Sequence, residues 1–446
     1  MRDFLHRKSK SISQAALVLA AFTFGAQLLS LVRDRLFASH VGAGIELDTY
    51  YYAFKIPDIL YAIFSALVSL TVLIPLLSKH KEGETDAMKH TYSVLFTVFC
   101  AGSSLLILIV FILMPHLVHY IAPGVVDVGT VGDIILYSRI LLLQPFFLGL
   151  SNLLGSYTQM KERFLLYACS PFIYNLATVL GLIVLYPKFG MAGVVSAVVI
   201  GSILHGLIQL PYIRNENFIP RFKKITRTEW RLIKEVITQS IPRALILSLV
   251  QIEFLFLNSI ASLMPQGNTS MLNLANNLQS VPLSLIGVSL VVASFPSLSR
   301  SYATGEKAEF RKIFTKTFKT ILLWCTLATL VLFALKKWVI YILLGAHSFS
   351  PESTTIIVTT FGIFILGLIP QCIEMLITRT YYAAGNTKKP AALNIFAAAL
   401  TIGLAYGFYH NGGGSSVIVL ALAFTIGAWI SCALFYVSIR RNLLKL

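Results

Sequence analysis

Charged residues are scarce in this chain of 446 residues, and their scarcity sets the class of protein. Only 12% of the residues are Asp, Glu, Lys or Arg, whereas 56% are hydrophobic and the mean hydropathy is +0.77. Soluble domains carry roughly 25% charged residues. A soluble fold could not remove so much apolar surface from water. We therefore expect an all-α, polytopic membrane protein whose main surroundings are the lipid bilayer.

Acidic residues are scarcer than basic ones, with 19 Asp and Glu against 36 Lys and Arg, so the formal net charge is +17. A basic protein can bind nucleic acid when its cations form one stripe. Here the cations recur between apolar runs instead. We therefore expect no nucleic-acid partner.

Motifs for soluble catalysis are also missing. The chain has no Walker loop, GxGxxG, GxSxG or HExxH pattern, so nothing in it is arranged to hold a nucleotide or to activate a nucleophile. Its five cysteines all fall inside apolar runs, without disulfide or zinc spacing, and are expected to be small buried hydrophobic residues. We expect no enzyme, no metal site and no cofactor, other than a coupling ion or the membrane potential.

Long apolar runs are abundant. About 20 apolar residues cross a bilayer as a helix. By this rule the chain has twelve candidate spans, at residues 11–32, 50–78, 91–121, 132–158, 165–186, 190–213, 232–264, 270–298, 313–343, 354–383, 390–410 and 415–438.

The cations between the spans predict the orientation. If the N-terminus is cytoplasmic, 28 of the 36 Lys and Arg residues fall in cytoplasmic segments and only five in the opposite loops. Cytoplasmic loops are enriched in Lys and Arg. Both termini are therefore expected in the cytoplasm.

Two proline motifs recur in the same order at nearly one spacing. Pro75 and Pro296 are 221 residues apart, and Pro171–Asn175 matches Pro390–Asn394 at an offset of 219. This predicts two parallel six-helix bundles, 1–213 and 235–446, joined by a basic cytoplasmic linker, 214–234. Transporters built from parallel repeats bind substrate between the halves.

Ionisable residues inside spans usually face a cavity or a partner. Lys55 and Asp58 are neighbours on one helix face and either neutralise each other or serve a cleft. Glu253 has no basic residue within a helical turn; it either carries a proton or cation or is satisfied across the cleft. Glu374 is expected to form a structural pair with Arg379 near the membrane edge.

A series of motifs along the chain resembles one family. Arg33-Asp34, Gly42, Gly44 and Asp48–Pro57 are followed by Ala122-Pro-Gly124, Val281–Val288, Phe295–Ser299 and Tyr381–Pro390. In this order they resemble the MurJ (MviN) family of lipid II flippases, within the multidrug/oligosaccharidyl-lipid/polysaccharide exporter superfamily. The resemblance implies a bacterial inner-membrane protein, two lobes around a V-shaped cationic cavity, and a lipid-linked oligosaccharide as cargo.

The resemblance also implies where the cargo binds. Arg33 and Asp48 match family positions, Lys55 follows at the family spacing, and an Arg33–Asp48 ion pair is expected to join the first two helices. At three positions where the family has arginine, this chain has Gln27, Tyr61 and Asn277. The candidate substrate-binding residues therefore come from the first two helices and the eighth, and they are Gln27, Arg33, Asp48, Lys55, Tyr61, Asn276 and Asn277. Glu253 is the candidate for ion coupling.

Three functions stay open at this point. The leading one is a flippase for lipid II or a related lipid-linked oligosaccharide, working by alternating access. The second is a cation-coupled drug or polysaccharide exporter of the MATE type, in which Glu253 is central. The third is a membrane scaffold that recruits cell-wall synthesis proteins through its basic cytoplasmic loops.

Overall fold

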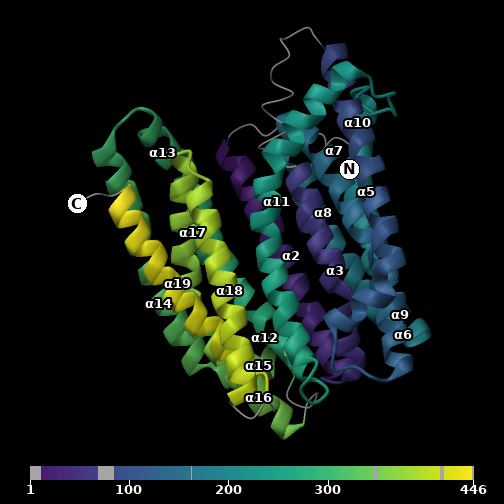
Figure 1. Cartoon of the computed structure of the whole chain (residues 1–446), viewed down its shortest axis with the longest axis vertical. Coiled ribbons are helices and arrows are strands. Elements are labelled where there is room, and N and C mark those ends of the chain that lie inside the picture. Colours follow the sequence, from purple (N-terminus) through teal and green to yellow (C-terminus); the bar gives the residue numbers. More distant parts are fainter. Residues whose placement is uncertain (1–11, 69–84, 162, 346–349, 412–415, 444–446) are drawn as a thin grey trace. The chain divides into compact units, whose positions relative to one another are not determined.

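The computed structural model describes residues 12–68, 85–161, 163–345, 350–411 and 416–443. This part of the chain is helical, and no β-strand occurs in it (Figure 1). In a bilayer, a helix satisfies its own backbone hydrogen bonds, which explains why so apolar a sequence folds this way. The all-α prediction is confirmed.

Each expected span coincides with a helix or with consecutive helices, and the second is described only as far as residue 68. Within the described residues, nine helical stretches are long and apolar enough to cross a membrane, and one of these, Ala168–Asn215, contains two of the expected spans. The motif around Pro75 and the basic residues at positions 2–10 lie outside the described residues.

The helices form two compact units. Unit 1 comprises Met1–Phe37, Tyr52–Tyr120 and Val126–Gln251. Its elements are α2 (Ile12–His40), most of α3 (Ile45–Leu67), α5 (Thr85–Ile121), α6 (Val128–Leu141), α7 (Leu143–Met160), α8 (Phe164–Leu180), the π-helix η1 (Gly181–Leu185), α9 (Tyr186–Leu207), α10 (Leu210–Asn215) and the first part of α11 (Arg227–Ala261).

Unit 2 comprises Ala38–Tyr51, Ile121–Val125 and Ile252–Leu446. Its elements are the end of α11, α12 (Asn268–Pro282), the π-helix η2 (Leu283–Val288), α13 (Ser289–Ala303), α14 (Lys307–Ala334), α15 (Lys336–Leu344), α16 (Pro351–Leu366), α17 (Leu368–Ala383), α18 (Lys388–Asn411) and α19 (Ile418–Asn442). The start of α3 also belongs to this unit, so segments of the two units alternate along the chain.

Proline and glycine shape several of these helices. The wider turns of η2 begin directly after Pro282, which has no N–H to continue the α-helical ladder. Gly190 interrupts α9 with a φ of +57°, a left-handed conformation that favours glycine. The Val281–Val288 motif therefore contains the change from the α-helix α12 to the π-helix η2.

The core of unit 2 surrounds α17. Cys325, Cys372 and Cys432 are buried in it, together with Tyr381 and Phe435. All five cysteines of the chain are buried and free. The expectation that they behave as small buried hydrophobic residues is confirmed.

Candidate functional site

The charged, aromatic stretch Arg33–Pro57 is almost entirely helical. α2 continues to His40 and α3 begins at Ile45, so only residues 41–44 connect them. Gly42 in this connection has a φ of +76°, which a residue with a side chain adopts only with strain. The stretch is therefore mainly helix and not a solvated connection between two helices.

Asp48 holds the N-terminus of another helix. Its carboxylate accepts hydrogen bonds of 2.6 Å from the backbone N–H groups of Gly267 and Ser270, and one from the Ser270 hydroxyl. The first N–H groups of a helix have no partner within it, and a carboxylate satisfies them and complements the helix dipole. Asp48 is only 2% exposed. It therefore caps α12 from a position 219 residues earlier in the chain.

A cluster of backbone contacts surrounds this cap within unit 2. Gly267 has a φ of +89° and lies so close to Ala43 that a Cβ would come within 2.8 Å of its carbonyl oxygen. The backbone N–H of Gly124 donates to Ser262 Oγ at 3.1 Å. Asn268 Oδ1 accepts from a backbone N–H at the start of α19 at 3.0 Å. These contacts bring residues 43–48, 121–125, 262–270 and 417 together within unit 2.

Arg33 has a carboxylate partner in its own helix. Its Nη2 lies 2.7 Å from Asp34 Oδ1, and Nη2 also donates to Ser30 Oγ at 3.0 Å. Asp34 is 1% exposed. Each member of the expected Arg33–Asp48 pair therefore has a partner within its own unit, and the pair itself stays a prediction.

Lys55 and Asp58 interact on α3, as their spacing predicts. Each lies in the electrostatic field of the other, and Lys55 is only 7% exposed. A buried ammonium that loses water needs such a countercharge. This electrostatic interaction fits either of the roles that the sequence left open.

The neutral candidates lie on three helices and are partly buried. Gln27 is on α2, Tyr61 on α3, and Asn276 and Asn277 on α12. The structure joins two parts of the predicted set directly, since Asp48 caps the helix that carries both asparagines. The candidates thus divide between unit 1 and unit 2.

Two carboxylates interact electrostatically inside unit 2. Glu253 of α11 is hydrogen-bonded to Thr401 of α18, and its charge acts on Glu374 of α17. Glu374 Oε1 is buried and has no hydrogen-bond partner among the described residues. Two like charges in a low-dielectric site repel strongly, so a shared proton or a bound cation stabilises such a pair.

The expected Glu374–Arg379 pair is wrong. The Arg379 guanidinium lies 5.8 Å from the centre of the Phe295 ring and the residue is exposed, whereas Glu374 faces Glu253. Residues five apart point about 140° from each other around a helix of 3.6 residues per turn. They could not lie on one face of α17.

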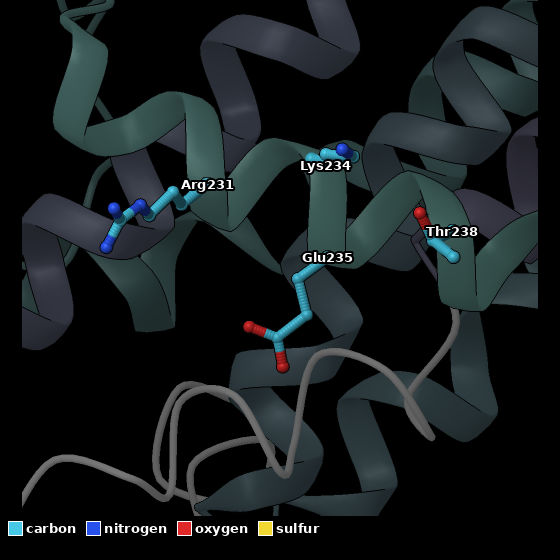
Figure 2. Close-up of a pocket in the computed structure, with 4 residues that line it drawn as sticks. All are labelled: Arg231, Lys234, Glu235 and Thr238. Carbon is cyan, nitrogen blue, oxygen red and sulfur yellow. The ribbon is translucent and has the colours of Figure 1, made fainter.

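A further cavity lies on α11. It has a volume of about 370 Å³ and is lined by Arg231, Lys234, Glu235 and Thr238, whose side chains are drawn in Figure 2. Their side chains point in different directions and come from one helix, so they do not converge on a common ligand.

The fold defines the class of protein. A solved lipid II flippase MurJ in an inward closed conformation matches the chain with a TM-score of 0.82 at 22% identity, over 95% of this chain and 87% of that one. An inward-facing MATE transporter of the MOP superfamily matches with a TM-score of 0.74 at 16% identity, over 94% of both chains. The fold is therefore that of the MurJ and MATE polytopic membrane transporters.

Sequence comparison then identifies the family. The model of the family described as "Lipid II flippase MurJ" matches residues 37–446. The lipid II flippase MurJ of Burkholderia cenocepacia is 23% identical over 97% of this chain and 84% of its own length. A probable lipid II flippase MurJ of Buchnera aphidicola subsp. Acyrthosiphon pisum is 26% identical over 93% and 81%. This chain belongs to the MurJ lipid II flippase family.

Proposed function

We propose that this chain moves lipid II, or a closely related lipid-linked oligosaccharide, across the cytoplasmic membrane of a bacterium by alternating access. The observation that carries the proposal is the match of residues 37–446 to the flippase family. Both termini face the cytoplasm in this proposal, as the distribution of Lys and Arg indicates. The bundles 1–213 and 235–446 open to either side in turn.

A buried cation in α3 supports the substrate class. A pyrophosphate headgroup that leaves water needs fixed positive charge or hydrogen-bond donors in exchange. Lys55, with Arg33, supplies charge, while Gln27, Tyr61 and the Asn276–Asn277 pair supply neutral donors for sugar hydroxyls. Asp48 has a structural role in this proposal, because its oxygens already accept from the backbone of α12.

The carboxylates Glu253 and Glu374 are proposed to couple transport to a proton or a monovalent cation. Their proximity and the unpartnered Oε1 atom support this role. Glu253→Gln removes one negative charge while keeping the shape and the hydrogen bond to Thr401. Transport by this variant should lose its dependence on pH or on Na⁺, whichever the unmodified protein shows. Unchanged dependence in the variant would contradict the coupling role.

Complementation tests the function. Cells depleted of their own lipid II flippase should grow when they express this chain and lyse when they do not. Lys55→Met should fail to support growth. Failure of the unmodified chain, when it is present in the membrane, would remove the proposal.

A double variant separates the two roles of Lys55. If Lys55 and Asp58 only neutralise each other, the double variant Lys55→Met/Asp58→Asn should support growth, because no buried charge is left unpaired. If Lys55 binds the headgroup, the double variant should fail although it folds. The scaffold function makes a third prediction, namely no growth of the depleted cells and no lipid movement in vesicles that contain the purified protein.

A further inference from the structure

A cavity in unit 1 is lined mainly by cations. It has a volume of about 660 Å³ and lies between the start of α5 and the segment that follows α10. Two lysines and two arginines line it, namely Lys89, Arg214, Arg221 and Lys223, together with His90 and a single carboxylate, Asp86. We call it the basic pocket.

No salt bridge neutralises the lysines and arginines of the basic pocket in the part of the chain that the structure describes. Among the described residues the only ion pair of the pocket joins His90 to Glu229 at 3.7 Å. Cations that line one pocket, two of them guanidinium groups, match the oxygen atoms of a phosphate group.

The segment that forms one wall of the pocket is docked on α5. The Arg221 N–H donates to Ser93 Oγ at 3.3 Å, and the Lys223 N–H donates to Thr97 Oγ1 at 2.9 Å. Just before them, the buried Phe218 ring stacks on Tyr157 at 3.9 Å, with the ring planes 10° apart. The backbone makes these hydrogen bonds, so the side chains of Arg221 and Lys223 are left to serve a ligand.

The same segment exposes apolar side chains beside the cations. Ile219 is 48% exposed, Phe222 72% and Ile225 40%. Apolar side chains that alternate with cations in this way are suited to the interface of a membrane, where the apolar groups enter the acyl region and the cations meet headgroups. A pocket for a free phosphate ion would gain nothing from them.

We propose that the basic pocket binds the phosphate group of an anionic phospholipid in the cytoplasmic leaflet. The inference goes beyond the proposed function and shares with it only the orientation of the chain. Basic pockets at the cytoplasmic ends of transmembrane helices are suited to such headgroups, and the anionic leaflet adds attraction for each cation. A bound lipid would bridge α5 and the segment between α10 and α11.

Binding of dioctanoyl phosphatidylglycerol to the purified full-length chain in an uncharged detergent tests the proposal. The double variant Arg214→Gln/Arg221→Gln should bind about 30-fold more weakly, since each cation near an anionic headgroup contributes roughly a fivefold gain. The matched control Lys224→Gln/Arg227→Gln removes the same charge from nearby positions of the chain that lie outside the pocket lining. It should bind within about twofold of the unmodified protein.

Two further arms identify the ligand. Zwitterionic dioctanoyl phosphatidylcholine should bind weakly, and inorganic phosphate should displace phosphatidylglycerol only at much higher concentration. Equal losses in the pocket and control variants would overturn the proposal, as would unchanged binding by a pocket variant with an unaltered melting temperature. Displacement by inorganic phosphate at concentrations equal to those of the lipid would assign the pocket to free phosphate and overturn the lipid assignment.

Discussion

Removing the Asp48 carboxylate should destabilise unit 2 more than removing the carboxylate of an exposed acidic residue. Asp48→Ala leaves the N–H groups of Gly267 and Ser270, which bond to Asp48 at 2.6 Å, without acceptors in a buried place. An unsatisfied buried donor costs about 1–3 kcal/mol, so two predict a loss of about 2–6 kcal/mol. Asp48→Asn keeps one carbonyl acceptor and should lose about half as much.

Thermal unfolding of the purified protein in detergent measures this effect, with Glu352→Ala as the control because Glu352 is an exposed carboxylate in the first turn of α16. A melting temperature for Asp48→Ala equal to that of the control would refute the capping argument. The charge swap Arg33→Asp/Asp48→Arg should not rescue stability. A guanidinium group has only donors and cannot accept from the backbone of α12.

Three further predictions concern other parts of the chain. Gly124→Ala should destabilise by about 1–3 kcal/mol in thermal unfolding, because its Cβ would lie 1.9 Å from a backbone oxygen, whereas Gly102→Ala meets nothing within 4 Å and should be neutral. Phe218→Ala should release its segment and make nearby Lys and Arg bonds cleavable by trypsin within minutes, since truncating a buried Phe costs about 3–5 kcal/mol; unchanged cleavage would contradict the docking. Hydrogen bonds from the side chain and backbone of Thr226 hold the pKa of Glu229 below its ordinary value of 4.5. The ionised Glu229 carboxylate therefore stabilises the folded protein fully above pH 4.5, and this stabilisation is lost as the pH falls through the lowered pKa. The melting temperatures of the protein and of Glu229→Gln should therefore converge on acidification, and a constant difference would refute the contribution.

Much of the fold could be predicted because hydropathy and cation distribution are local properties of the chain. The same holds for the electrostatic interaction of Lys55 with Asp58, which follows from a spacing of three on a helix. The angular rule that explains this interaction also excludes a Glu374–Arg379 pair, so that expectation could have been corrected from the sequence.

The role of Asp48 could not be predicted in this way. Its partners lie 219 and 222 residues away, and only folding brings them together. The sequence showed an arginine nearby, and charge complementarity suggested a pair. Backbone N–H groups are acceptable partners for any carboxylate, and no residue pattern marks them.

The linker between the bundles was predicted only in part. Its basic character was evident, but residues 218–226 dock on α5 and α11 begins at Arg227. The signal was the pair of aromatic residues, Phe218 and Phe222, which contact aromatic side chains of unit 1. A spacing of four residues is compatible with a helix and with an extended segment. The sequence alone therefore could not predict that this segment is not a helix and packs on α5.

The most direct test of the proposed function is lipid movement by the purified protein. Proteoliposomes that contain this chain and fluorescent lipid II on one leaflet should transfer it to the other leaflet faster than empty liposomes, as measured by quenching with a reagent that cannot cross the membrane. Lys55→Met in the same vesicles should reduce the rate to that of empty liposomes. An identical rate with and without the unmodified protein, at a confirmed density of folded protein, would contradict the proposal.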